Sequence, residues 1–166
     1  MRHMNKNKII KFQKPTKQTP EPISKGVALF NEGVVFYEQG NYDIAYKKFI
    51  EAEKLGFKSI ILYNNIICIL ECDCKKNIKK ILKYIDKSIK YDDKNGAIYL
   101  LKGFALSEAG DYEKALESFL KAYKLGCDDP LIYVEISETY HALNDYLKEI
   151  AFISNGLKNT QIAKNV

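Results

Sequence analysis

The stretch YEQGNYDIAYKKFIEAEKLG, residues 37–56, recurs 70 residues later as SEAGDYEKALESFLKAYKLG, residues 107–126. Aligned without gaps, 9 of the 20 positions carry the same residue. Agreement at one constant spacing predicts that a single structural unit is repeated along the chain. The identical pairs are Glu38/Glu108, Gly40/Gly110, Tyr42/Tyr112, Ala45/Ala115, Phe49/Phe119, Ala52/Ala122, Lys54/Lys124, Leu55/Leu125 and Gly56/Gly126.

Two weaker copies complete the pattern. The offset of 70 is twice 35, and ILYNNIICIL at 60–69 has the apolar spacing of ALFNEGVVFY at 28–37. A fourth copy opens at Pro130. We therefore expect an array over 26–166, built of repeats at 26–59, 60–95, 96–129 and 130–158 and a short C-terminal extension.

Each copy has the pattern of two helices joined by a tight turn. In the first helix, Leu29, Gly33 and Phe36 form one stripe at helical spacing. Gly40 suits a left-handed helix end, and Asn41 suits the cap of the next helix. The third copy repeats this device with Gly110 and Asp111.

The second helix places small and large residues alternately on one face, at Tyr42, Ala45, Phe49 and Ala52. Such alternation lets two helices cross closely while an aromatic ring fills the groove between them. Neither helix buries its apolar face alone, so neighbouring copies are expected to stack.

This pattern closely resembles the tetratricopeptide repeat, a helix–turn–helix unit of 34 residues. The resemblance implies an all-α fold, an α-solenoid superhelix of about four repeats whose first helices line a concave groove. It covers about residues 26–158. The matching residues are Gly33, Phe36, Gly40, Tyr42, Ala45, Phe49 and Ala52, and then Tyr99, Gly103, Gly110, Tyr112, Ala115, Phe119 and Ala122.

The resemblance also implies a function, namely a non-enzymatic protein–protein interaction module or scaffold that binds a peptide or partner helix in the groove. An apolar floor ending in acidic residues predicts a ligand with apolar anchors and a Lys or Arg. The alternative for Phe30, Val34, Leu100 and Phe104 is a plain core between repeats. The candidate ligand-binding residues are Phe30, Val34, Tyr37, Asn64, Asn65, Cys68, Leu100, Leu101, Phe104, Glu135 and Glu138. Glu71, Ser107, Val134 and His141 occupy equivalent positions.

One subtype of the family does not fit. Members that bind a chaperone's C-terminal carboxylate use cationic side chains on successive first helices. Here only Asn65 matches that set, because Ala97 and Leu101 stand where the cations would be. Without a cation the groove has nothing to neutralise a carboxylate.

The charge of the chain is unevenly distributed. Residues 1–25 hold seven basic side chains and one acidic one, whereas 26–166 hold 19 basic and 20 acidic. We expect 1–25 to be a disordered basic tail, and its segment NKIIKF, residues 7–12, is a candidate ligand for the groove; a solvated arm is the alternative.

A second charged feature is a run of seven lysines between Lys75 and Lys90, which predicts an outward helix face opposite Ile81, Ile85 and Ile89. The functional alternative is polyanion or nucleic-acid binding through this ridge, helped by the basic tail.

Other signals are weak. Cys68, Cys72 and Cys74 make a three-thiol set, but structural zinc favours four ligands. We expect reduced, mostly incidental thiols in a cytoplasmic protein, with metal binding and redox sensing as alternatives. No catalytic motif, cofactor motif or membrane-spanning run appears in the sequence. Surplus apolar residues after Ile150 predict self-association, or a chain cut from a longer array.

Overall fold

The computed structural model describes residues 21–154, and these residues are helical throughout, with no strand among them. They fall into two compact units that meet between Cys72 and Asp73. The first unit holds α1 (Glu21–Glu38), α2 (Tyr42–Lys54) and α3 (Ile60–Leu70); the short 3-10 helix η1 (Glu71–Asp73) spans the boundary. The second holds α4 (Cys74–Ile89), α5 (Gly96–Glu108), α6 (Tyr112–Lys124), α7 (Leu131–Ala142) and a further helical stretch at 146–154.

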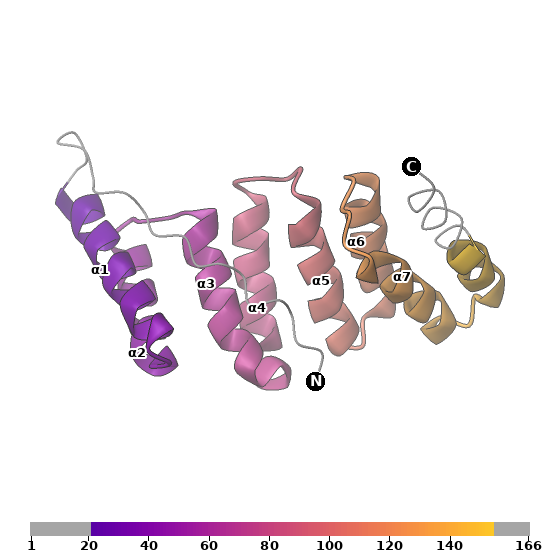
Figure 1. Ribbon diagram of the computed structural model, residues 1–166, viewed down its shortest axis with the longest axis horizontal. Coiled ribbons are helices and arrows are strands. Elements are labelled where there is room, and N and C mark those ends of the chain that lie inside the picture. The colour runs from indigo at the N-terminus through magenta and orange to yellow at the C-terminus, as the bar shows by residue number, and fades with distance from the viewer. Residues whose placement is uncertain (1–20, 155–166) are drawn as a thin grey trace. The chain divides into compact units, whose positions relative to one another are not determined.

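The predicted hairpins are present. α1 with α2, and α5 with α6, form helix pairs joined by a tight turn (Figure 1). The expected end of the tail at residue 25 is wrong, because α1 begins at Glu21, with Pro22 in the first turn where proline is tolerated. The expected disorder of residues 1–20 lies outside the described residues. The boundary between the units falls inside the predicted second repeat, which contributes α3 to one unit and α4 to the other.

The helices of each hairpin cross where a glycine meets a phenylalanine. A Cβ atom added at Gly33 would lie 2.6 Å from Cε1 of Phe49, and one added at Gly103 would lie 2.3 Å from Cδ1 and Cε1 of Phe119. Both phenylalanines are fully buried. The expected close crossing, with an aromatic ring in the groove, is confirmed in both copies.

The turns also repeat. Gly40 and Gly110 have φ of 79° and 78°, a region that favours glycine. In each turn the N–H of the glycine and of the next residue donate back to the last turn of the preceding helix, over 2.9 to 3.0 Å. These bonds satisfy carbonyls that a helix end would otherwise leave unpaired. The fourth copy makes the same turn with Asn144, at a φ of 59°.

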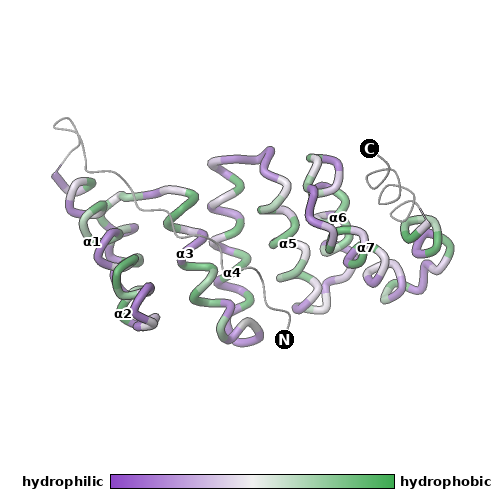
Figure 2. Tube along the Cα trace, viewed as in Figure 1, coloured by the Kyte–Doolittle hydropathy of each residue, from purple (hydrophilic) through white to green (hydrophobic). Residues whose placement is uncertain are grey.

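The core of the second unit lies between α5, α6 and α7. Hydrophobic and hydrophilic residues alternate along α4, as expected for a helix with one buried face (Figure 2). On that helix Ile81 and Ile85 are buried, whereas the predicted lysine face is mostly exposed. The buried core residues are Leu100, Leu106, Ala115, Phe119, Ala122, Ile132, Ile136 and Tyr140.

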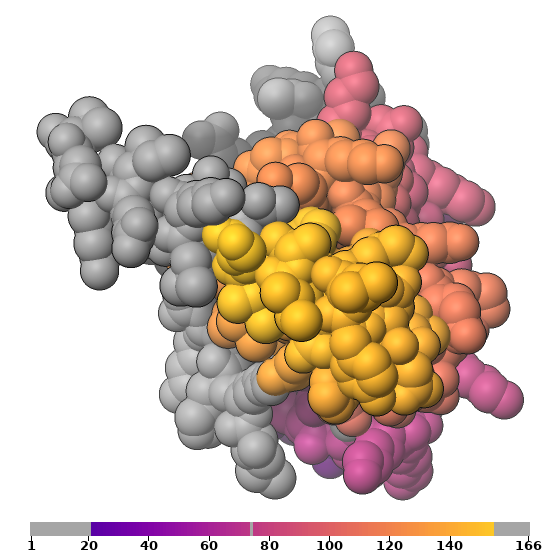
Figure 3. Space-filling model, turned by 90° about the vertical axis from the view of Figure 1, so that its right-hand side faces the viewer, coloured from indigo at the N-terminus to yellow at the C-terminus, as the bar shows by residue number. Residues whose placement is uncertain are grey.

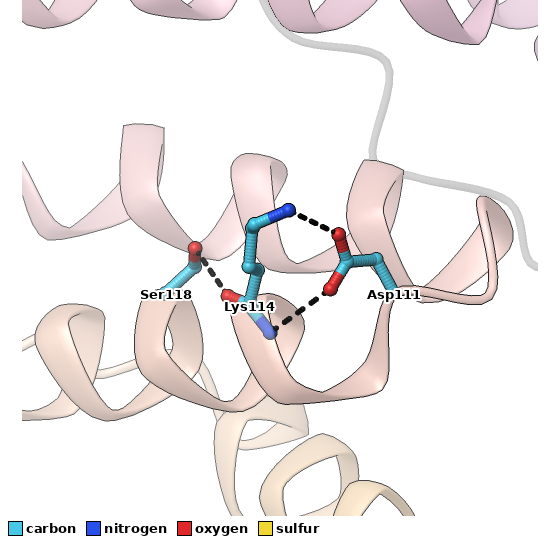
Figure 4. Close-up of polar contacts among 3 residues, drawn as sticks. All are labelled: Asp111, Lys114 and Ser118. Atoms are coloured by element: carbon cyan, nitrogen blue, oxygen red, sulfur yellow. Dashed lines mark hydrogen bonds and ion pairs between the residues drawn. The ribbon is translucent and has the colours of Figure 1, made fainter.

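The second helices begin differently in the two clear copies. At α6, Asp111 Oδ1 accepts a hydrogen bond from the backbone N–H of Lys114 at 3.4 Å, and its Oδ2 contacts Lys114 Nζ at 2.6 Å (Figure 4). One turn later Ser118 Oγ donates to the carbonyl of Lys114. At α2, the side chain of Asn41 makes no capping hydrogen bond.

This difference gives a matched pair of substitutions. We expect Asp111→Ala to lower the melting temperature by a few degrees, because it removes the acceptor at the start of α6. Asn41→Ala should leave the melting temperature nearly unchanged, since no cap is lost. Thermal unfolding followed by circular dichroism measures both, and equal losses would contradict the assignment of the cap.

Candidate functional site

Several predicted groove residues are buried within their own unit. Phe30 and Val34 on α1 have no exposed surface, and the ring of Phe30 lies 5.5 Å from that of Phe49 and 5.2 Å from that of Phe57. Leu100 on α5 is 6% exposed and belongs to the core of the second unit. The prediction that these three contact a ligand is wrong, and the alternative interpretation as core is correct.

Three further residues need partial correction. The ring of Phe104 lies edge-on to that of Phe119, 5.6 Å between centroids, so this residue is half core. Glu135 is only 4% exposed, which leaves Glu138 as the accessible member of the predicted acidic pair on α7. Asn65 on α3 is also buried, and its Nδ2 has no hydrogen-bond partner.

The remaining candidates are accessible. Tyr37 on α1, Asn64 and Cys68 on α3, and Leu101 on α5 are half-buried, and Glu138 is exposed. Asn64 and Cys68 lie one helical turn apart, and Glu71 continues their stripe. The amide oxygen of Asn64 is buried without a hydrogen-bond partner. An unpaired buried acceptor of this kind is unfavourable, so a donor from a ligand would stabilise it.

The first unit brings five of its side chains together at the ends of α1 and α3; we call them the Tyr37 cluster. Its members are Tyr37, Tyr42, Cys68, Glu71 and Cys72. The rings of Tyr37 and Tyr42 lie 5.1 Å apart, edge to face. The sequence analysis overlooked Tyr42 and Cys72 as members. The repeat spacing does pair Tyr37 with Glu71, which lies 34 residues further along.

The pKa values in this cluster are shifted in one direction. Burial, and then the charge of Cys68, raise the pKa of Tyr37 to about 12. Burial, followed by the charge of Glu71, raises the pKa of the Cys68 thiol to about 11, and burial alone raises the pKa of the Glu71 carboxyl. Each shift disfavours negative charge, which is expected where acidic groups gather without a cation among them.

A second accessible surface lies on α7. Val134, Glu138 and His141 occupy one stripe of this helix, and all three are exposed. Nδ1 of His141 lies 3.0 Å from the carboxylate of Glu149. We call this the α7 stripe.

Residues 146–154 form much of the face turned to the viewer in Figure 3. The ring of Phe152 packs 5.6 Å from that of Tyr123. In contrast, Leu147 is 84% exposed and Ile150 is 65% exposed. The predicted surplus of apolar residues at this end is therefore present, while Leu157 lies outside the described residues.

The lysine ridge is confirmed as an outward face of α4. Lys79, Lys83 and Lys90 are exposed, and they border a shallow depression of about 510 Å³ together with Leu82, Asp86 and Lys87. The single acid in this set, Asp86, is bound 2.8 Å from Lys102 on α5. The ridge thus keeps most of its positive charge.

Among the described residues, no three potential metal ligands are placed to hold an ion. Cys68, Cys72 and Cys127 are free thiols. None of the described helices combines the length and the apolar character that crossing a membrane requires.

Comparison with known proteins agrees with the repeat. No family model matches the chain. The TPR repeat-containing protein MJ1428 of Methanocaldococcus jannaschii is 30% identical over 128 residues, which are 77% of this chain, and the chain spans 22% of the length of that relative.

Two solved structures have a similar fold. MamA of Desulfovibrio magneticus RS-1 matches with a TM-score of 0.70 at 17% identity, over 82% of this chain and 76% of that one. YrrB, described as a TPR protein with an unusual peptide-binding site, matches with a TM-score of 0.69 at 16% identity, over 80% of this chain and 68% of that one. Together with the glycine–phenylalanine hairpins, these similarities show that the chain belongs to the tetratricopeptide-repeat proteins.

Proposed function

We propose that this chain is a non-enzymatic protein-interaction module that binds a peptide or a helix of a partner along the first helices of its repeats. The observation that carries the proposal is the accessibility of those helices at equivalent repeat positions. Asn64, Cys68 and Glu71 on α3 are half-buried, and the α7 stripe is exposed. YrrB, which shares the fold, is described as having a peptide-binding site.

The chemistry of these positions defines the ligand. Val134 is a large apolar residue that is 45% exposed, and Glu138 places a carboxylate one helical turn away. Apolar burial would supply most of the binding free energy, and the acid would favour a ligand with Lys or Arg. The free thiols are consistent with a cytoplasmic location, which we propose as well.

A second candidate function is polyanion binding by the lysine ridge. It is favoured by one observation, namely that Asp86, the only acid bordering the depression on α4, is already paired with Lys102. Neighbouring lysines at i, i+4 repel one another, and an anionic partner would relieve that repulsion. This binding would weaken steeply as salt rises.

One affinity-capture experiment tests both functions. The full chain, a Val134→Ser/Glu138→Lys variant and a Lys79→Gln/Lys83→Gln variant are immobilised and exposed to lysate of the source organism. We expect a protein that the unaltered chain retains at about 0.5 M salt, where the screening length is only about 4 Å. The α7-stripe variant should retain at least about tenfold less of it, a loss of about 1.4 kcal/mol.

The lysine-ridge variant is the matched control, because it changes two exposed side chains on a different helix. If the retained material is lost with the ridge variant and with salt, and is unaffected by the α7-stripe variant, polyanion binding replaces the proposed function. Retention that neither variant changes would contradict both.

A further inference from the structure

The Tyr37 cluster gathers negative charge with no cation to balance it. α1 ends just after Tyr37 and α3 ends just before Glu71. A helix C-terminus carries roughly half a negative charge, which basic residues in the last turn usually offset. Neither α1 nor α3 has a basic residue in its last turn.

The side chains of the cluster are suited to an ammonium group. Tyr37 and Tyr42 pair at 5.1 Å and offer aromatic faces, which attract cations. Asn64, on the same stripe of α3 as Cys68, has a buried amide oxygen without a donor. The raised pKa values of Tyr37, Cys68 and Glu71 agree, because a positive charge among them would reverse each shift.

We propose that the Tyr37 cluster is a binding site for a lysine side chain, and that its occupant is a lysine of residues 6–14 of the same chain. The proposal rests on the proposed function, because Tyr37, Asn64 and Cys68 belong to the surface that a partner peptide would use. The amino-terminal segment then competes with the partner for that surface.

Charge favours this occupant. Residues 1–20 contain six basic side chains and no acidic one, whereas residues 21–72 contain five lysines and seven acidic residues. The segment NKIIKF, residues 7–12, also carries Ile9, Ile10 and Phe12, which could cover apolar surface beside the cluster.

The length of the chain also fits. From Glu21 to Tyr37 the axis of α1 rises about 24 Å, at 1.5 Å per residue. An extended chain covers about 3.3 Å per residue, so roughly seven residues return from Glu21 to the level of Tyr37. That places Lys14 at the level of the cluster, and Lys11 is within reach after a short turn.

Zero-length cross-linking of the full chain with a carbodiimide tests this contact, since the reagent joins a carboxylate only to an amine that touches it. We expect mass spectrometry to find Glu71 linked to a lysine between Lys6 and Lys14. Glu71→Gln should abolish this product, and Lys11→Gln/Lys14→Gln should reduce it at least tenfold. Glu51→Gln, which changes an exposed carboxylate on α2, is the matched control and should leave the yield unchanged.

Mixing isotopically heavy and light chains identifies the source of the lysine. Products of a single isotope support the segment of the same chain, whereas mixed products would overturn that assignment in favour of a second copy. The proposal also fails if Glu71 forms no such product while Glu51 is labelled by added glycinamide. Failure here leaves the capture result on α7 unaffected, so the two proposals fail separately.

Discussion

Replacing Phe119 by alanine should lower the free energy of unfolding of the second unit by about 3–5 kcal/mol, the usual cost of removing a fully buried ring. The loss should be large because the ring fills the crossing of α5 and α6 and contacts the core that α7 completes. Urea unfolding followed by circular dichroism, with amide exchange to assign the loss to α5–α7, measures the effect. The total stability of a domain is about 5–15 kcal/mol, so this single change removes a large share of it.

Phe104→Ala is the matched control for that substitution. Its ring lies against Phe119 at 5.6 Å but is only partly buried, so its removal should cost clearly less. Phe49→Ala should reproduce the large loss in the first unit, because Phe49 occupies the equivalent crossing. Equal costs for Phe104 and Phe119 would show that both rings belong to the core to the same degree.

The second large effect is expected from Gly103→Ala, a substitution that usually stabilises a helix. Alanine exceeds glycine in helix propensity by about 0.8–1.0 kcal/mol. Here the new Cβ would lie 2.3 Å from the ring of Phe119, so helices or ring must move. Overpacking of this kind costs about 1–3 kcal/mol, and sometimes more, so we expect net destabilisation by urea titration.

A double-mutant cycle tests the cause of that loss. With Phe119→Ala already present, the ring is absent, and Gly103→Ala should become neutral or stabilising. If Gly103→Ala destabilises equally in both backgrounds, the close crossing is not the reason for the glycine. Gly33→Ala with Phe49→Ala provides the same cycle in the first unit.

Much of the fold is predictable because its determinants are local and repeated. Gly33 with Phe49, and Gly103 with Phe119, specify a close crossing through residue size alone, and the turn glycines specify where each helix ends. The second copy has Ile67 at the position of Gly33 and Gly103, and the boundary between the two units falls within this copy. The repeat pattern predicted one continuous array and did not predict that boundary.

The site was harder to predict, because helical periodicity shows which residues share a face but not what covers that face. Phe30 and Val34 have the spacing of groove residues, and only the rings of Phe49 and Phe57 beside Phe30 reveal a core. The Tyr37 cluster depends on contacts between α1 and α3, residues more than 30 positions apart. Its electrostatic character arises from burial, which a sequence does not record.

The turns at Gly40 and Gly110 close through main-chain hydrogen bonds alone. The neighbouring Gln39 and Ala109 are exposed, and only their backbone atoms take part in the turn. These two positions are therefore natural points for attaching fluorophores, one in each unit, since a dye there replaces no packing contact. Energy transfer between such a pair would report any change in separation when a partner binds.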